Sequence, residues 1–250
     1  TTAPGGFIAA ATLMYAVGFI DDLREVSAPS KLAGMVLAAM VLVISGTAIL
    51  TFRVPRLGLF LVSDDLVPLL TVLWVIGIAN AINLIDGLDG LAAGVVGIAA
   101  GTFAIYGHVL MEAEIIGTDN LGPLLACLAC GTCLGFLPHN VHPAKIFMGD
   151  GGALLLGLML AASTVSVGGR IDQAVDGQVF FFFAPLVIPL LLLGVPLADL
   201  TLAVLRRATR KGVGIADADK EHLHHRLMRL GHGHRSGGCV ARRRSPEARC

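Results

Sequence analysis

Seven long apolar runs, separated by short polar segments, restrict what this chain can fold into. They cover residues 5–20, 32–50, 66–82, 91–111, 121–138, 153–167 and 179–198. A helix needs about 20 predominantly apolar residues to cross a bilayer, and several of these runs approach that length. We therefore predict an all-α fold, a polytopic transmembrane helix bundle with about seven spans.

Composition agrees with a membrane as the solvent. Of the 250 residues, 55% are hydrophobic and only 14% are charged, whereas a soluble domain carries about 25% charged residues. The formal net charge is zero, so bulk charge gives no reason to expect a polyanionic partner. We expect no nucleic acid among its partners.

The loops between the runs differ in positive charge. If every run crosses once, alternate loops share a face, which groups 21–31, 83–90, 139–152 and 199–250 against 51–65, 112–120 and 168–178. Before residue 236, the first group carries eleven Lys or Arg residues and the second carries three. The positive-inside rule then makes the first face cytoplasmic. Seven of the eight histidines also lie on it.

Two adjacent carboxylates, Asp21 and Asp22, follow the first run directly. Carboxylates at a membrane boundary are costly unless they bind a cation or accept a proton. A solvated helix end is the alternative interpretation. Because soluble prenyl synthases also use aspartate-rich runs, this motif alone is not specific.

Polar side chains recur every three residues at the end of the third run, at Asn80, Asn83, Asp86 and Asp89. Residues three apart share one face of a helix, while the glycines between and after the aspartates indicate that the helix breaks. This pattern predicts a strip of amides and carboxylates that points into a crevice. Packing alone explains such a strip poorly.

A third polar segment, 147–152, places Asp150 among glycines. Such an aspartate can coordinate a hard cation while a phosphate approaches the backbone, although Gly-Asp-Gly is also a common turn. His139, Asn140 and His142 belong to the same loop.

A fourth segment places three histidines, His222, His224 and His225, inside a basic stretch at 206–235. The histidines alone would fit zinc, but basic groups beside imidazoles suit a diphosphate better. A polybasic segment held to anionic lipid headgroups is a further alternative.

Taken together and in this order, the four motifs resemble the polyprenyl-phosphate N-acetylhexosamine-1-phosphate transferase family. The family pattern is an aspartate pair, Asp-Gly-x-Asp-Gly-Leu, Met-Gly-Asp and a late His-x-His-His, found here at 21–22, 83–91, 148–150 and 222–225. The histidine motif and the Arg-Leu-Met-Arg-Leu-Gly-His after it resemble the N-acetylglucosamine (GlcNAc) branch. The phospho-MurNAc-pentapeptide transferases of peptidoglycan synthesis, which usually carry a Lys where Glu25 stands, are the alternative.

The resemblance implies transfer of GlcNAc-1-phosphate from UDP-GlcNAc to polyprenyl phosphate, giving polyprenyl diphosphate-GlcNAc and UMP. This would be the first membrane step of a cell-envelope polysaccharide pathway. Two anionic groups must meet in this reaction, so a divalent cation is expected, Mg²⁺ or alternatively Mn²⁺. The expected setting is the bacterial plasma (inner) membrane, with the active site on the cytoplasmic face. A homodimer is left open.

The resemblance also implies roles for individual residues. Asp21 and Asp22 are expected to be catalytic, because they would orient or deprotonate the lipid phosphate. Asp150 and Asn83 are expected to hold the metal ion.

Two further groups are expected to bind the substrates. Those expected to lie toward the uridine are Asp86, Asp89 and Asn140. Those expected to contact phosphates or sugar are His222, His224, His225, Lys31 and Arg226.

Members of the family have about ten to eleven spans, so we expect the chain to be a fragment of such a fold. We expect a transmembrane domain at 1–205, a cytoplasmic basic loop at 206–235 and an atypical, non-native tail at 236–250. Two rival functions remain: a membrane transporter, because intramembrane carboxylates and broken helices are common there, and a zinc-dependent membrane hydrolase.

Overall fold

A computed structural model describes residues 3–24, 26–54 and 58–168, together with Gly194, Ala198, Thr201 and Leu202. Its elements are α1 (Ala3–Arg24), α2 (Ala28–Ile44), β1 (Thr51–Val54), β2 (Gly58–Leu61), α3 (Leu66–Ile85), α4 (Leu91–Glu112), α5 (Leu121–Asn140) and α6 (Gly149–Gly168). Each of the first six predicted runs forms a helix, so the predicted helical bundle is confirmed. The seventh run, 179–198, lies outside the described residues except for its Gly194 and Ala198.

Five of the described helices, all except α2, are long and apolar enough to cross a membrane. The first and sixth runs looked short in the sequence, but α1 has 22 residues and α6 has 20. Helix α2 is a shorter apolar helix of 17 residues. The chain is therefore a multi-pass membrane protein.

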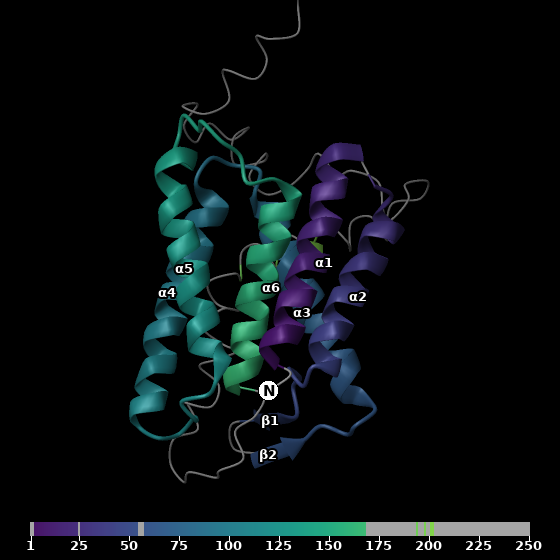
Figure 1. Cartoon of the computed structure of the whole chain (residues 1–250), viewed down its shortest axis with the longest axis vertical. Coiled ribbons are helices and arrows are strands. Elements are labelled where there is room, and N and C mark those ends of the chain that lie inside the picture. Colours follow the sequence, from purple (N-terminus) through teal and green to yellow (C-terminus); the bar gives the residue numbers. More distant parts are fainter. Residues whose placement is uncertain are drawn as a thin grey trace, which may run out of the picture.

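Successive helices run in opposite directions, so the bundle has two distinct ends (Figure 1). The carboxylate end, at the top of Figure 1, is where α1, α3 and α5 finish and α2, α4 and α6 begin. The hairpin end, at the bottom, holds β1 and β2. This alternation agrees with the predicted grouping of the loops.

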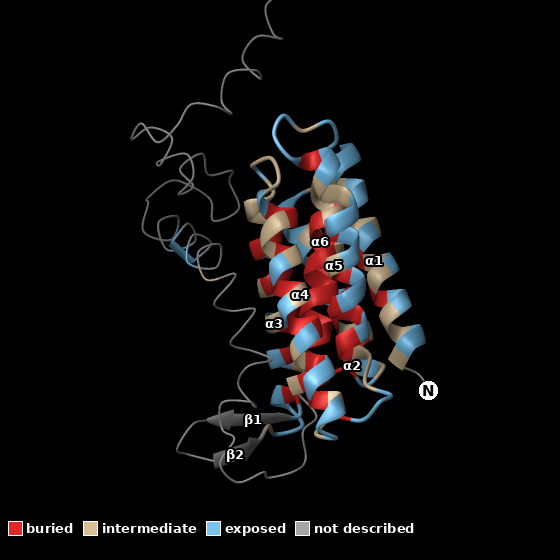
Figure 2. Cartoon of the chain, turned by 90° about the vertical axis from the view of Figure 1, so that its left-hand side faces the viewer, coloured by how far each residue is buried: buried red, intermediate tan, exposed pale blue. Residues whose placement is uncertain are grey.

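Helix α6 lies at the centre of the described bundle, as the burial map in Figure 2 shows. Of the residues in its apolar span, 83% are buried, compared with 17% in the apolar span of α1. Small residues allow the close approach: an added Cβ at Gly157 would meet the backbone of Ala79 in α3. Helices in lipid pack closely where such residues face each other.

Local sequence determines where several helices begin. Pro29 occupies the first turn of α2, where its missing N–H is not needed. Asn120 caps α5, since its Oδ1 accepts a hydrogen bond from the N–H of Gly122 at 2.8 Å. Gly90 directly precedes α4 and has a φ of +75°, and Gly149 begins α6 and has a φ of +69°. Both values favour glycine.

The predicted loop 51–65 contains an antiparallel hairpin that the helical prediction did not include. Thr51 pairs with Leu61, and Val54 pairs with Gly58. Two short runs rich in β-branched, aromatic and aliphatic residues, separated by three residues that begin with Pro55 and followed by Gly58, are a hairpin signal. The hairpin lies at the end of the bundle away from the carboxylates.

Candidate active site

Three separate segments bring polar side chains together at the carboxylate end. The α1–α2 pair contributes Asp21 and Asp22 from the end of α1 and Lys31 from the start of α2, α3 contributes Asn83, and the start of α6 contributes Asp150. Loop grouping predicted this convergence of 21–31, 83–90 and 139–152. The fourth predicted segment, with His222, His224, His225 and Arg226, lies outside the described residues.

The ammonium group of Lys31 lies at the centre of this convergence. Its Nζ is 2.7 Å from Asp21 Oδ2 and also forms an ion pair with Asp150 Oδ2. In the amide orientation that satisfies both neighbours, Asn83 Oδ1 accepts from Lys31 Nζ at 3.2 Å and its Nδ2 donates to Asp150 Oδ1 at 3.0 Å. We call Asp21, Lys31, Asn83 and Asp150 the Lys31 cluster.

The Lys31 cluster has the chemistry of a site for a hard cation. Two carboxylates face one ammonium, so one negative charge is left over. The oxygens of Asp21, Asn83 and Asp150 already surround a positive group, and oxygen is the ligand that hard divalent cations prefer. Within the described ranges, no group of three or more His, Cys, Asp or Glu side chains is arranged to hold a metal. A cation here would therefore use amide and carboxylate oxygens, such as those of Asn83 and Asp150.

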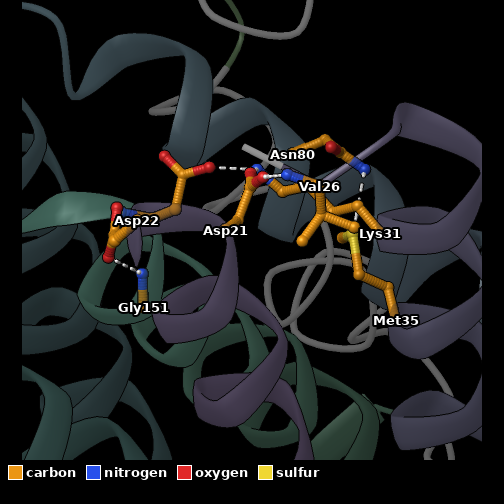
Figure 3. A network of polar contacts seen from close by, with 8 residues as sticks. Asp21, Asp22, Val26, Lys31, Met35, Asn80 and Gly151 are labelled. Carbon is orange, nitrogen blue, oxygen red and sulfur yellow. Dashed lines mark hydrogen bonds and ion pairs between the residues drawn. The ribbon is translucent and has the colours of Figure 1, made fainter. Parts of the chain in front are cut away.

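Asp22 points away from its neighbour Asp21. Its Oδ1 accepts from the backbone N–H of Asp150 at 2.8 Å, and its Oδ2 accepts from the N–H of Gly151 at 3.1 Å. Figure 3 shows Asp22 facing Gly151 while Asp21 turns toward Lys31 and Val26. The carboxylate thus meets the first turn of α6.

Asp86, the residue directly after α3, faces the same first turn. The backbone of Gly149 donates a hydrogen bond to its carboxyl, so the first three N–H groups of α6 all meet carboxylates from α1 or α3. Burial, then the negative charges of Asp150 and Asp22, raise the pKa of Asp86 to about 6, against the opposing effect of that hydrogen bond.

A second polar group lies beside the Lys31 cluster and joins 86–90 to the loop before α6. Asp89 Oδ2 contacts His142 Nδ1 at 2.9 Å and accepts from the N–H of Ala144 at 3.2 Å. The hydrogen bond from His142 and that from the backbone hold the pKa of Asp89 below its usual range. Asp89 is therefore ionised near neutral pH.

Asn140 makes the second link between these loops. It is buried, its Oδ1 accepts from the N–H of Gly90 at 3.0 Å, and its Nδ2 donates to the carbonyl of Ile146 at 3.0 Å. Both ends of the amide are thus engaged with backbone. We call Asp89, Asn140 and His142 the loop latch.

The predicted strip of four polar side chains is not continuous. Asn80 donates to the carbonyl of Ile76 and lies near the Met35 sulfur of α2. Asn83 joins the Lys31 cluster, Asp86 meets the start of α6, and Asp89 belongs to the loop latch. The strip breaks because α3 ends at Ile85, so helical spacing no longer applies beyond it.

Two residues beside the site had no role in the sequence analysis. Phe147 lies in the loop before α6 with 77% of its surface exposed, an unusual position for an aromatic residue beside polar groups. Gly18 lies against the backbone of Asp150 and Gly151. Its only signal in the sequence is its place four residues before Asp22.

The transporter alternative predicts a site near the middle of the membrane. The described carboxylates of this site lie instead at one end of the helices, where α1 and α3 finish and α6 begins. The zinc alternative depends on the histidines at 222–225, which lie outside the described residues.

The chain is similar to known proteins over most of its length. A family model described as glycosyl transferase family 4 matches residues 5–168. The decaprenyl-phosphate N-acetylglucosaminephosphotransferase of Mycobacterium tuberculosis is 41% identical over 242 residues, which cover 94% of this chain and 59% of that relative. The protein of the same name in Mycolicibacterium smegmatis is 41% identical over 235 residues, with 91% and 57% covered.

A relative with another substrate in its name matches less of the chain. The phospho-N-acetylmuramoyl-pentapeptide-transferase of Desulforudis audaxviator is 36% identical over 183 residues, which cover 66% of this chain and 53% of the relative. The chain thus spans little more than half the length of each of these relatives.

Proposed function

The chain belongs to glycosyltransferase family 4, and on that premise we propose that it transfers GlcNAc-1-phosphate from UDP-GlcNAc to polyprenyl phosphate. The products would be polyprenyl diphosphate-GlcNAc and UMP. One observation carries the proposal: three distant segments of a membrane bundle bring Asp21, Lys31, Asn83 and Asp150 together at one end. The named activities of the mycobacterial relatives support the same reaction.

The extent of similarity favours GlcNAc over MurNAc-pentapeptide as the sugar. The mycobacterial GlcNAc-phosphotransferases match more than nine tenths of the chain, whereas the pentapeptide transferase matches 66%. We propose a bacterial plasma membrane location with the Lys31 cluster on the cytoplasmic side, because positively charged loops group with that end.

Charge neutralisation is the main task of the site in this proposal, since a lipid phosphate must approach an anionic diphosphate. Asp150 and Asn83 would hold Mg²⁺, or alternatively Mn²⁺. When bound, that ion supplies charge neutralisation and alignment of the phosphate oxygens. Lys31 would supply a second positive group, held in place by Asp21 at 2.7 Å. His222, His224, His225 and Arg226 would add further contacts to phosphate or sugar.

Asp21 is the member of the aspartate pair that we assign to orienting the lipid phosphate, because it faces Lys31. Asp22 faces α6 instead. A phosphate monoester has a second pKa near 6, so at pH 7 the lipid phosphate is largely ionised already. We therefore propose direct attack of the phosphate oxygen on the diphosphate, without a protein nucleophile.

The nucleotide would lie on the side of the loop latch. Asp86 and Asp89 stand at this side of the site, and Asn140 holds the two loops together. The exposed ring of Phe147 offers a flat apolar face on which a base can stack. We propose that these four residues bind or shape the uridine site.

The test is a transfer assay with purified protein in lipid nanodiscs. Radiolabelled UDP-GlcNAc, Mg²⁺ and undecaprenyl or decaprenyl phosphate should give labelled lipid and UMP, and EDTA should stop the reaction. UDP-MurNAc-pentapeptide in place of UDP-GlcNAc tests the other branch. Failure to form a lipid product with any UDP-N-acetylhexosamine would contradict the proposed function.

A further inference from the structure

We infer that Gly18 and Asp22 are positioning residues that form a seat on α1 for the N-terminus of α6. The seat fixes the backbone of Asp150, whose carboxylate belongs to the Lys31 cluster. The inference rests on the proposed function for the importance of Asp150. Its geometric basis is independent of any substrate.

Gly18 allows the two helices to touch through their backbones. An added Cβ at Gly18 would lie 2.5 Å from the carbonyl oxygen of Asp150 and 2.6 Å from the Cα of Gly151. Real Cβ atoms do not approach backbone so closely, so any side chain at this position must push α6 away from α1. The close contact between α1 and α6 therefore requires a glycine at position 18.

Asp22 lies four residues after Gly18, on the same face of α1. Each of its carboxylate oxygens accepts one backbone N–H from the first turn of α6, that of Asp150 or of Gly151. A helix leaves its first N–H groups without partners inside the helix, and a negative charge at that end is favourable. Asp22 therefore acts on α6 as a capping residue supplied by another helix.

Glycines at the start of α6 also allow this close contact with α1. Gly149 has φ +69°, and a Cβ there would lie 2.7 Å from Asp22 Oδ2. A Cβ at Gly151 would lie 3.2 Å from the backbone nitrogen of Phe19. The glycines on either side of Asp150 thus admit α1 and its carboxylate, a use separate from any approach of phosphate to the backbone.

The two adjacent aspartates consequently have different tasks. Asp21 faces Lys31 and holds the ammonium, whereas Asp22 holds the backbone from which the Asp150 side chain projects. A positioning role needs a hydrogen-bond acceptor at residue 22. It does not need a group that takes up a proton.

This distinction can be tested with Asp22→Ala and Asp22→Asn, because asparagine is also a good helix cap but is not a base. We would measure hydrogen–deuterium exchange of the peptide covering 148–153, with EDTA present. Exchange should accelerate about tenfold in Asp22→Ala, the effect of losing a cap. It should accelerate less in Asp22→Asn, because asparagine keeps one of the two acceptor oxygens and can still accept one of the two N–H groups. The transfer rate of Asp22→Asn should exceed that of Asp22→Ala, with the acidic limb of the wild-type pH profile preserved.

Gly18→Ala gives an independent test, with Gly5→Ala as its matched control on the same helix. An added Cβ at Gly5 has no described atom within 4 Å. Exchange at 148–153 should accelerate in Gly18→Ala and remain at the wild-type rate in Gly5→Ala. The same comparison applies if Asp22→Ala fails to fold.

Two outcomes would overturn the inference. The first is unchanged exchange at 148–153 in both Asp22→Ala and Gly18→Ala. The second is slower exchange in Asp22→Asn than in Asp22→Ala together with transfer rates that are equally low, since the negative charge would then act in the reaction itself. If the wild type transfers no sugar phosphate, the proposed function fails, while the exchange measurements still decide whether the seat exists.

Discussion

The two ends of α6 are held by different chemistry. At its start, carboxylates of Asp22 and Asp86 meet the backbone N–H groups, and the Lys31 cluster lies alongside. Near its end, the contacts are neutral: Asn120 Nδ2 donates to the carbonyl of Ser166 at 2.8 Å, and Ser163 Oγ donates to that of Gly122 at 2.6 Å.

Neutral hydrogen bonds are therefore sufficient to anchor this buried helix to its neighbours. Four carboxylates at the other end, those of Asp21, Asp22, Asp86 and Asp150, exceed what packing needs. Charges at a membrane boundary are expensive. The difference between the two ends of α6 indicates that the carboxylate end has a function beyond stabilising the fold.

Removal of one charge from the carboxylate end should have the largest effect. Asp150→Asn keeps the size of the side chain but loses half of the anionic oxygens of the Lys31 cluster. We expect the transfer rate to fall by at least about a hundredfold, since charge stabilisation worth about 3 kcal/mol corresponds to that factor. The matched control is Asp65→Asn at the hairpin end, where Asp65 makes no side-chain cap. Equal transfer rates in Asp150→Asn and Asp65→Asn would contradict a special role for the carboxylate end.

Removal of the Lys31 ammonium from the carboxylate end should have the second largest effect. Lys31→Met leaves Asp21 and Asp150 without their positive partner, which we expect to lower the free energy of unfolding by about 2 kcal/mol in EDTA, because breaking a largely buried ion pair leaves charge uncompensated. Mg²⁺ should restore more stability to Lys31→Met than it adds to the wild type. Thermal unfolding with and without Mg²⁺ measures both. Identical gains from Mg²⁺ would mean that Mg²⁺ does not bind beside the carboxylates that Lys31 neutralises.

A change at the neutral end should affect stability alone. Asn120→Ala removes the α5 cap and the hydrogen bond to the Ser166 carbonyl, so we expect a loss of about 1 kcal/mol in the free energy of unfolding. Asn120→Asp keeps the capping oxygen and should recover part of that loss. The transfer rate per folded molecule should stay near wild type in both variants. A fall comparable with that of Asp150→Asn would show that the ends are not separable.

The smallest effect should be on pH dependence. The pKa of Asp86 in the folded protein is about 6, above its ordinary 3.8, so ionisation of this carboxyl disfavours the folded state. Stability should therefore fall as the pH rises from about 4 to about 6 and then level off. In EDTA, Asp86→Asn should reduce the loss of melting temperature between pH 5 and pH 7.5. Asn120→Ala, which removes no titrating group, should keep the wild-type slope.

Much of the bundle follows from hydropathy, because a helix that crosses lipid must be long and apolar. Runs read from the sequence match six helices to within a few residues at most ends. The meeting of Asp21, Asn83 and Asp150 followed from the alternation of loops, a rule that needs no knowledge of packing. The hairpin at 51–61 escaped the helical analysis because its apolar runs are only four residues long.

The directions of the side chains could not be predicted in this way. Adjacent residues on a helix point about 100° apart, so Asp21 and Asp22 cannot face one ligand equally, and the sequence does not say which of them faces α6. The role of Gly18 depends on a crossing between helices more than 120 residues apart. The motif places Asn140 toward the nucleotide, and only the structure shows that its amide also joins two loops.

The spacing of the Lys31 cluster along the chain has a consequence for biosynthesis. Lys31 follows Asp21 by 10 residues, whereas Asp150 comes 119 residues after Lys31. The ribosome therefore completes the α1–α2 pair long before α6 emerges. Asp21 receives its counter-ion as soon as that pair inserts, so the charge is neutralised during the interval in which the last partner has not yet been made.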